Sequence, residues 1–197
     1  MKRFFQYWQN YGIAFDADLT QQLALHTRLY TAKREEMVEG PLQARRRYYF
    51  VLSGCLVCEK YTLTGGMLTQ RFVLPQESFT STVHLYTPRP AHLSFTALKA
   101  TDLLVIDNSE LQQLEQKYQA VSDILHILKQ RYITQLDLHV QLLQQPDGYA
   151  RFCFLQDNMP ELCAQVSNAY LQRFLGISNG TFYTYQRRYL LEKLRKK

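Results

Sequence analysis

The hydrophobic pattern of this chain changes its period near Ser109. Between Arg28 and about Ile106, short runs of aromatic and β-branched residues alternate with glycine, proline and other turn residues, a pattern typical of short strands. After Ser109, apolar residues recur three and four positions apart, as they do on one face of a helix. The sequence therefore predicts an α+β chain in which an antiparallel roll or barrel of about seven or eight strands precedes several helices.

The part before Ser109 contains six runs that we expect to be strands, and helices are expected to precede them. A first, aromatic-rich helix lies near the N-terminus, and a second is expected over residues 16–29, beginning at Asp16 or Asp18. A turn is expected at 64–66, and residues 75–91, with three prolines, are expected to form a loop containing one helical turn. The six expected strands are residues 28–33, 46–52, 55–63, 67–74, 92–98 and 102–107.

Length and composition limit where such a chain can work. Its 197 residues can hold one or two domains, and 46% of them are apolar, which is enough for a substantial core. No run of about 18 apolar residues is present, and the N-terminus lacks the apolar stretch and cleavage site of a secretion signal. We therefore expect a cytoplasmic protein without a membrane span.

The longest helical pattern runs from about residue 120 to residue 143 or 145. A shorter helix, capped by Ser109 with Glu110 and extending to Tyr118, is expected before it, and the Gln-Pro-Asp-Gly run at 145–148 is expected to end it. Apolar spacings of three and four sustained over about three heptads favour a coiled-coil-like seam between two copies of the chain. Burial of the helix against its own domain is the alternative. The expected dimer contacts are Ile124, Leu128, Tyr132, Gln135, Leu136, His139 and Leu142.

Residues 166–189 combine two short helical patterns with a glycine turn. Leu171 and Phe174 belong to an apolar stripe, Gly176 breaks the helix, and Ser178 can cap a second helix. Two short helices joined in this way form a helix-turn-helix, a motif whose second helix enters the major groove of DNA. An ordinary helical hairpin at the end of a globular domain is the alternative.

Basic residues gather in the same part of the chain. From Gln165 onward, seven basic residues stand against one acid, Glu192, so this segment carries a charge of +6, which equals that of the whole chain. The preceding residues are neutral overall, and a basic excess confined to one segment favours a surface that contacts DNA phosphates. A basic tail that only aids solubility is the alternative. The seven are Arg173, Arg187, Arg188, Lys193, Arg195, Lys196 and Lys197.

The cysteines and histidines do not form a recognisable metal site. Cys55 and Cys58 lie three positions apart in a strand-like run, so their side chains should point to opposite faces, and no further ligand at zinc-like spacing lies nearby. The other two cysteines are distant in sequence, and His84 with His92 would need a third donor. We expect buried structural thiols and no metal; an iron–sulfur or redox-sensing role for the CxxC pair is the alternative.

This order of elements resembles the Crp/Fnr family of bacterial transcription regulators over nearly the whole chain. The local resemblance lies in RRYYFVLSGCL (46–56), FVLPQESFTS (72–81), FTALKATDLLVI (95–106) and VSNAYLQRFLGIS (166–178). It implies a cyclic-nucleotide-binding-like roll, a double-stranded β-helix, at 1–118, a dimerisation helix at 119–145 and a winged helix-turn-helix domain at 146–197. It also implies a homodimer, double-stranded DNA and RNA polymerase as partners, and a small-molecule effector.

The resemblance locates the ligand-binding residues of the roll, and the charged ones are missing. In cyclic-nucleotide binders of the family, a Gly-Glu pair holds the ribose and a later Arg grips the cyclic phosphate; the matching positions here are Thr80, Ser81 and Ala91. Arg89 could reach into the same pocket, and His92 stands where a small hydroxyl residue is usual. Because a buried phosphate without its arginine would be unpaired, we expect that cyclic AMP is not the ligand and that no cofactor is bound. The aromatic character of the roll is compatible with an apolar effector and equally with an ordinary β-roll core, so the effector stays unknown.

The second helix of the helix-turn-helix also departs from the family. Members often carry Arg, Glu and Arg to read base edges, and the matching positions here are Asn179, Gly180 and Thr184. Asn can pair with adenine and Thr can touch a thymine methyl, which favours an operator richer in A·T pairs. Gln172 replaces the alanine that the family prefers, so its amide must turn outward or find a partner. The expected DNA-contacting residues are Asn179, Gly180, Tyr183, Thr184, Arg187, Arg188, Arg173 and Ser178.

These observations together predict a homodimeric DNA-binding transcription regulator of Crp/Fnr type that does not respond to cyclic AMP. The alternative is a small-molecule or protein-binding module whose helix-turn-helix no longer reads DNA. An enzyme is not expected, because the sequence contains no recognisable catalytic set, phosphate loop or cluster of carboxylates.

Overall fold

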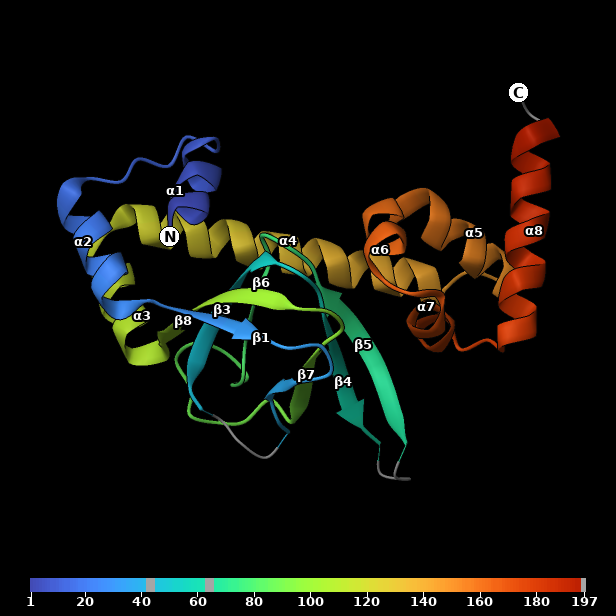
Figure 1. Ribbon diagram of the computed structural model, residues 1–197, viewed down its shortest axis with the longest axis horizontal. Coiled ribbons are helices and arrows are strands. Elements are labelled where there is room, and N and C mark those ends of the chain that lie inside the picture. Colours follow the sequence, from blue (N-terminus) through green and yellow to red (C-terminus); the bar gives the residue numbers. More distant parts are fainter. Residues whose placement is uncertain (42–44, 63–65, 196–197) are drawn as a thin grey trace. The chain divides into compact units, whose positions relative to one another are not determined.

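The computed structural model describes residues 1–41, 45–62 and 66–195, and the chain divides into two compact units. The first unit, Met1–Tyr132, contains every strand that the structure describes, and the described part of the second, Ile133–Lys197, is helical (Figure 1). The division falls inside the helix α4 (Gln119–Leu143), whose bounds confirm the long helix expected from the sequence. No helix among the described residues is long and apolar enough to cross a membrane.

The first unit is built on two four-stranded sheets, in which every strand pairs antiparallel to its neighbours. The first sheet has the order β1-β8-β3-β6, and the second has the order β2-β7-β4-β5. This arrangement confirms the expected antiparallel roll and all six expected strands. The strands are β1 (Arg28–Ala32), β2 (Met37–Glu39), β3 (Arg47–Ser53), β4 (Leu56–Tyr61), β5 (Met67–Val73), β6 (Ser78–Thr80), β7 (Leu93–Ala97) and β8 (Thr101–Asp107).

Two strands and one loop differ from the expectation. β2 and β6 contain three residues each, too few to show the period-two alternation by which a strand is recognised. β6 therefore lies inside the 75–91 segment that was expected to be a loop, and no helical turn forms within that segment, all of which the structure describes. Of the turn expected at 64–66, residues 64 and 65 lie outside the described residues.

Three shorter helices accompany the sheets. α1 (Lys2–Gln9) precedes α2 (Ala17–His26), and the Asp16 carboxylate caps α2 by accepting a hydrogen bond of 2.7 Å from the Leu19 amide. α2 ends three residues before the expected Leu29, because residues 28 and 29 pair with β8. α3 (Asn108–Lys117) begins directly after β8, so Ser109 lies within the helix and is not its cap, which corrects the expectation.

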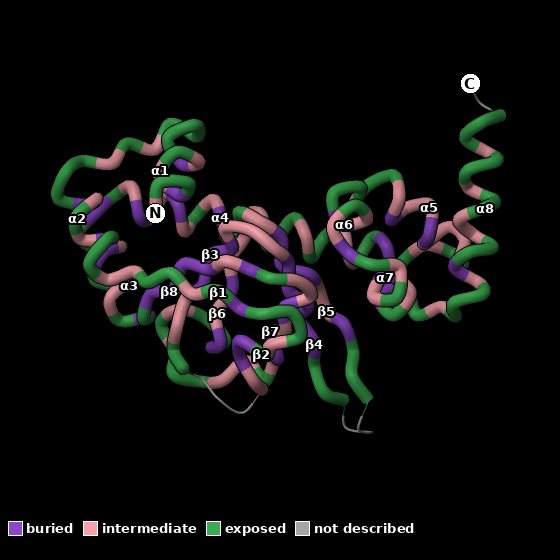
Figure 2. Tube along the Cα trace, in the orientation of Figure 1, coloured by how far each residue is buried: buried purple, intermediate pink, exposed green. Residues whose placement is uncertain are grey.

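Strands β3 and β8 bury both of their faces and so belong to two cores. Leu103 and Val105 point into the core between the two sheets, whereas Leu104 and Ile106 point into a second core beneath the helices. Successive residues of a strand face opposite sides, so one continuous apolar run serves both cores. The buried stretches along these strands and the adjoining face of α4 can be followed in Figure 2. The sole tryptophan, Trp8 of α1, is fully buried in the second core.

One carboxylate is buried inside the roll. Glu39 of β2 is 1% exposed, and its Oε1 accepts a hydrogen bond from the Tyr49 hydroxyl. Its Oε2 has no hydrogen-bond partner among the described residues. Burial raises the pKa of Glu39 above its usual 4.5, although the Tyr49 hydrogen bond and nearby arginines oppose the shift. Folding therefore favours the protonated carboxyl.

Replacing Glu39 with glutamine should remove part of the pH dependence of stability. Because the pKa of Glu39 is raised on folding, the folded chain binds more protons than the unfolded chain above about pH 4.5, and the free energy of unfolding falls as the pH rises through this window. We expect Glu39→Gln to be at least as stable as the wild type at about pH 8 and to lose less stability between about pH 5 and pH 8. Urea unfolding at both values measures the difference. The exposed Glu35→Gln serves as control, and a wild-type pH profile in Glu39→Gln would contradict the assignment.

Candidate functional site

The second unit places four helices after the C-terminal half of α4. α5 (Gly148–Asn158) begins after Asp147, whose carboxylate accepts a 2.8 Å hydrogen bond from the Ala150 amide. α6 (Pro160–Gln165) follows. Pro160 lies at the start of α6, where proline is well suited because its missing N–H is not needed in the first turn of a helix. α7 (Asn168–Leu175) and α8 (Asn179–Arg195) complete the unit.

α7 and α8 form the expected helix-turn-helix. Gly176 ends α7 in the left-handed conformation, with φ of 66°, and the Ile177 amide donates a 3.1 Å hydrogen bond to the Gln172 carbonyl. Ser178 caps α8, because its hydroxyl accepts from the Thr181 amide at 3.3 Å. The motif is held by an apolar core in which Phe182 of α8 meets the ring of Phe152 at 5.2 Å, edge to face.

The exposed surface of α8 contains six of the eight residues expected to contact DNA. Gly180, Tyr183, Thr184 and Arg187 lie on the side away from the buried Phe182. Thr184 donates its hydroxyl to the Gly180 carbonyl at 2.9 Å, which leaves its methyl group as the outward-facing part. The six exposed residues are Asn179, Gly180, Tyr183, Thr184, Arg187 and Arg188.

Gln172, the residue that departs from the family preference, has a partner across the motif. Its Nε2 donates a 2.9 Å hydrogen bond to Oδ1 of Asn179. This bond joins α7 to the first residue of α8 and orients the Asn179 amide, whose NH₂ group remains a donor. The sequence indicated that the amide needed a partner, but only the tertiary structure identifies Asn179.

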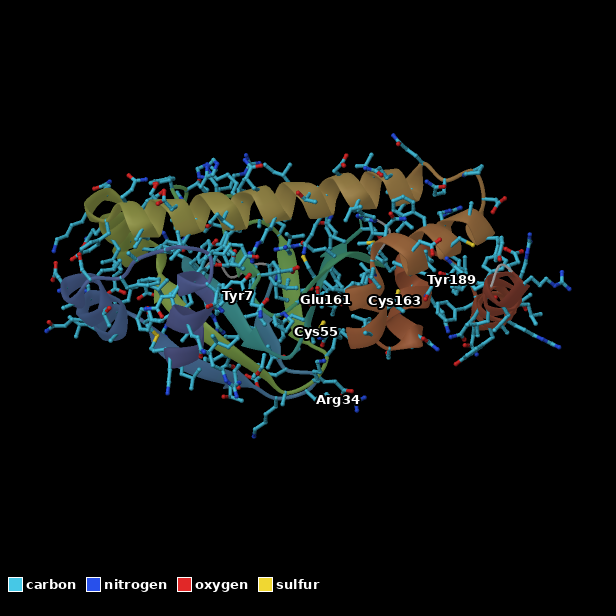
Figure 3. All side chains as sticks on the ribbon, turned by 90° about the horizontal axis from the view of Figure 1, so that it is seen from above. Tyr7, Arg34, Cys55, Glu161, Cys163 and Tyr189 are labelled. Atoms are coloured by element: carbon cyan, nitrogen blue, oxygen red, sulfur yellow. The ribbon has the colours of Figure 1, made fainter. Side chains whose placement is uncertain are left out.

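Two of the basic side chains on α8 are engaged within the unit. The Arg188 guanidinium lies 3.8 Å from the centre of the Tyr149 ring, and its Nε donates to Glu192 at 2.9 Å. Lys193 forms an ion pair of 2.8 Å with Asp157, which also accepts a hydrogen bond from Tyr189; Tyr189 is labelled in Figure 3. These contacts tie α8 to α5, so Arg188 and Lys193 have structural roles besides any contact with phosphate.

Arg187, unlike the adjacent Arg188, is not engaged in contacts within the described part of the unit. It is exposed and has no hydrogen bond, ion pair or ring contact among the described residues. Arg173 on α7 is also exposed and lies over the Tyr170 ring at 5.3 Å, while Ser178 stands at the turn between the helices. Lys196 and Lys197 lie outside the described residues. Arg187 and Arg195, which is likewise exposed and has no such contact among the described residues, are therefore the guanidinium groups of α8 that are most available to an anion.

The wing that the resemblance implies is not found among residues 133–195, which contain no strand. Instead, α8 continues for 17 residues to Arg195. No glycine or proline interrupts residues 181–195, and the Arg188–Glu192 pair at (i, i+4) supports the helix. The exposed face consequently extends past Arg187 to Leu190, Leu191 and Leu194.

Three of the seven expected dimer contacts are buried in the chain's own cores. Ile124 and Leu128 are 5% and 4% exposed beneath the first sheet, and Leu142 is fully buried in the second unit. His139 is half-buried and stacks on Phe174 at 4.7 Å, and this burial lowers its pKa. This corrects the expectation for these residues. Helical spacing indicates that a stripe is buried, but it does not say whether the same chain or a second copy covers it.

A different stripe on α4 is exposed. Ile133, Leu136, Val140 and Leu143 are 42–58% exposed and follow one another at spacings of three, four and three. Each of them lies one position after a residue of the expected seam, which is about 100° around the helix. Of the original set, only Leu136 belongs to this stripe; Tyr132 is 41% exposed beneath the Arg71 guanidinium, and Gln135 is partly buried.

A pocket of about 280 Å³ lies in the roll and contains part of the expected effector site. Thr80 and Ala91 line it, whereas Ser81, Arg89 and His92 do not. Ser81 is buried, with a hydroxyl that has no hydrogen-bond partner among the described residues, and Arg89 and His92 are exposed. The alternate phosphate clamp suggested for Arg89 is therefore not positioned at this pocket.

The cations that do line the roll pocket come from elsewhere in the chain. Arg71 of β5 donates to the Ser78 carbonyl at 3.2 Å and lies 4.5 Å from the centre of the Tyr132 ring. Lys129 of α4 lines the same pocket and is exposed. Neither residue was recognised from the sequence, because strand pairing and the path of α4 bring them to the pocket.

The CxxC cysteines are buried in the roll, and Cys55 is marked in Figure 3. Burial raises the pKa of Cys55 to about 12 and that of Cys58 to about 11, so both are protonated thiols at neutral pH. Cys58 belongs to the core between the sheets. Among the described residues no group of three or more histidine, cysteine or acidic side chains could hold a metal ion.

Two glycines of the helix-turn-helix should respond oppositely to alanine. A methyl group would meet no atom within 4 Å at Gly176 or at Gly180, so only backbone conformation matters. Gly176→Ala should lower the free energy of unfolding by about 1 kcal/mol, because Gly176 is left-handed, and Gly180→Ala should raise it by about 0.5 kcal/mol, because Gly180 is helical. Thermal and urea unfolding of the two variants test this, and a change of the same sign in both would exclude the proposed cause.

Comparisons with known proteins identify structural relatives only. No protein-family profile matches the sequence, and no curated protein matches it. Among solved structures, FixK2 from Bradyrhizobium japonicum matches with 17% identity over 85% of this chain and 86% of that chain, at a TM-score of 0.70. The c-di-GMP responsive global regulator CLP from Xanthomonas campestris matches with 14% identity over 91% and 94%, at a TM-score of 0.70. The catabolite activator protein from Thermus thermophilus matches with 18% identity over 91% and 86%, at a TM-score of 0.53.

These three proteins are regulators of the Crp/Fnr family, and each match covers most of both chains. The resemblance inferred from the order of elements agrees with these matches. A structural match over most of both chains at low sequence identity establishes a shared fold. It does not show that the residues of any site are shared. The chain therefore has the fold of the Crp/Fnr transcription regulators.

Proposed function

We propose that this protein is a DNA-binding transcription regulator in which α8 lies in the major groove. The observation that carries the proposal is the exposed face of α8, where Asn179, Thr184 and Arg187 follow one another on a capped helix-turn-helix. An amide and a methyl group can read base edges, and an unengaged guanidinium can bind a phosphate. The fold and the basic C-terminal segment support this role.

The base preference follows from the same side chains. Asn179 can hydrogen-bond adenine, and the Thr184 methyl can contact thymine. Gln172 would act indirectly, because its hydrogen bond orients the Asn179 amide. We propose an operator richer in A·T pairs than one read by two arginines and a glutamate.

The exposed stripe of α4 supports a homodimer. Ile133, Leu136, Val140 and Leu143 have the spacing of a coiled-coil seam and are uncovered in the single chain. Pairing of this stripe with its twin would present two copies of α8 to an inverted repeat, with half-sites one DNA turn, ~34 Å, apart. RNA polymerase would be the further partner of such a regulator.

The regulator would not use cyclic AMP. The roll pocket is lined by Ala91, which matches the arginine that holds the phosphate in cyclic-nucleotide binders, and the arginine that does line it, Arg71, comes from β5. We propose a different small-molecule effector, and no catalytic activity.

A protein-binding role is the second candidate, and one observation favours it. Leu190, Leu191 and Leu194 are 49–71% exposed on the face that continues from the DNA-reading residues of α8. An apolar continuation suits a protein partner better than a DNA groove.

Arg187→Ala should weaken binding to random duplex DNA and reduce its dependence on salt. Each phosphate contact removed lowers the slope of log affinity against log salt by about 0.9, and Arg187 has no structural partner whose loss would confuse the result. Fluorescence anisotropy at several salt concentrations gives the slope. Lys60→Ala, an exposed change in the roll, is the matched control. Arg188→Ala is less informative, since it also removes the contacts with Tyr149 and Glu192. An unchanged slope in Arg187→Ala would reject Arg187 as a phosphate contact.

Val140→Glu should convert the dimer into a monomer. Val140 is 50% exposed in the single chain, so the change should leave the fold intact while placing two carboxylates opposite each other in the paired helices. Analytical ultracentrifugation at micromolar concentration measures the mass. Leu25→Glu, at a position that is 72% exposed on α2, is the control and should remain dimeric. A wild-type chain that is monomeric under these conditions would refute the dimer.

A further inference from the structure

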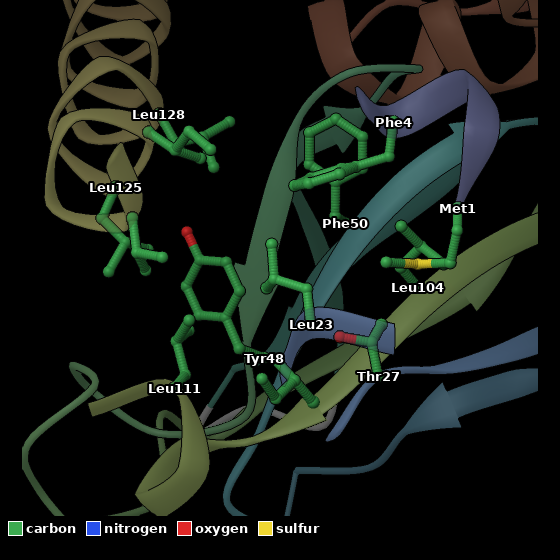
Figure 4. Close-up of a pocket in the computed structure, with 13 residues that line it drawn as sticks. Met1, Phe4, Leu23, Thr27, Tyr48, Phe50, Leu104, Leu111, Leu125 and Leu128 are labelled. Atoms are coloured by element: carbon green, nitrogen blue, oxygen red, sulfur yellow. The ribbon is translucent and has the colours of Figure 1, made fainter. Parts of the chain in front are cut away.

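A second cavity, of about 60 Å³, lies on the helix-covered face of the first sheet. Side chains from the N-terminal helices, from β3 and β8, and from α3 and α4 surround it, and none of the lining side chains is charged. Figure 4 shows Phe4, Leu23, Phe50, Leu104 and Leu128 around the space. Cavities with such walls stay dry and accept hydrocarbon.

Three side chains separate this apolar cavity from the roll pocket. Tyr48, Leu125 and Leu128 line both spaces. The Tyr48 ring points from β3 toward the helix that carries the two leucines (Figure 4), and its hydroxyl is hydrogen-bonded to Ser78 Oγ at 2.7 Å. Rotation of Tyr48 or Leu125 would therefore join a polar pocket of about 280 Å³ to an apolar one of about 60 Å³.

The charges around the roll pocket favour a single negative charge. Arg71 and Lys129 stand against one carboxylate, Glu115, which accepts a hydrogen bond from Tyr86. The lining thus has one positive charge in excess. Lys129 has no ion pair among the described residues, and the ammonium group can move on its flexible stem.

We propose that the first unit binds a monoanionic amphiphile, a carboxylate on an unbranched apolar chain. The carboxylate lies in the roll pocket near Lys129 and Arg71, and the chain passes Tyr48 so that its end fills the apolar cavity. An engineered apolar cavity of about 150 Å³ holds benzene, so this one suits roughly the last two or three carbons of the chain.

Such a ligand would be the effector of the proposed regulator, and this part of the inference rests on the proposed function. The chain would lie against Val121, Leu125 and Leu128, all on α4. The side chains that separate the two cavities must move to admit the ligand, so the ligand would bind one arrangement of α4 and its neighbours more tightly than another. Such a difference in affinity is required for a ligand to shift a conformational equilibrium.

Binding can be followed through Trp8 in the full-length protein. Its ring lies 6.3 Å from that of Phe4 and 6.1 Å from that of Phe50, both of which line the apolar cavity. Titrations with hexanoate, octanoate and decanoate, read by tryptophan fluorescence and by calorimetry, should give affinities that rise about fourfold per added methylene until the cavity is full. Decanol should bind more weakly than decanoate.

Two variants test the two ends of the site. Val121→Leu adds a carbon to the cavity wall and should weaken decanoate at least about fivefold while leaving hexanoate unchanged; Val166→Leu, a buried valine of the second unit, is its control. Lys129→Gln should weaken decanoate about threefold and leave decanol unchanged, with Lys60→Gln as control. The proposal would be overturned by any of three results: an affinity that does not change with the chain length of the carboxylate, equal effects of Val121→Leu and Val166→Leu on decanoate affinity, or no binding of decanoate.

These titrations contain no DNA, so their outcome is independent of whether α8 binds DNA. If decanoate binds but Arg187→Ala leaves the salt slope of DNA binding unchanged, the ligand site is supported and the proposed role of Arg187 in DNA binding is contradicted. A DNA affinity that decanoate changes in the wild type but not in Val121→Leu would support the ligand's role as effector. DNA binding without decanoate binding would contradict only the proposed ligand site and would leave the DNA-binding role supported.

Discussion

The first unit depends on a single constraint, which is that the first sheet must be covered on both faces. Leu103 and Val105 of β8 require the second sheet on one side, and Leu104 and Ile106 require helices on the other. The cover on that side includes α1, α2, α3 and the N-terminal half of α4, which together bury Trp8, Leu23, Leu114 and Val121. The roll therefore cannot be understood without α4, and any space left between them lies next to the helix that would carry a signal.

The roll pocket and the apolar cavity of the first unit both lie next to α4. A β-roll core alone would place an effector between the sheets, but here Tyr48 points away from that core and contributes to the walls of both spaces. Ser81 and Ala91 stand where cyclic-nucleotide binders carry charged residues, and the roll pocket is instead lined by Arg71 from a strand and Lys129 from a helix. A ligand recognised by these residues would have to be sensed through side-chain packing against α4, because α4 supplies part of each wall.

In the second unit, which has no strand among residues 133–195, backbone conformation, hydrogen bonds and ion pairs hold α7 and α8 in place. The left-handed Gly176 and the Ser178 cap define where α7 ends and α8 begins, and the Gln172–Asn179 hydrogen bond joins the two helices. Arg188 and Lys193 anchor the long α8 to α5, so the basic residues of this segment divide into structural and available ones. A net charge of +6 in the segment overstates the charge that is free to meet phosphate.

The sequence by itself determined the architecture, because periodicity and punctuation are local properties. Short apolar runs bounded by turn residues indicated β3 and β8, spacings of three and four indicated α4, and Gly176 with Ser178 indicated the helix-turn-helix. Three-residue strands such as β2 and β6 left no periodic signal. Tertiary structure alone decided which stripe of α4 is covered, which cations reach the roll pocket and which arginine is paired. Each of these depends on residues that are distant along the chain and meet only after folding, and hydrophobic spacing records that a face is buried without recording what buries it.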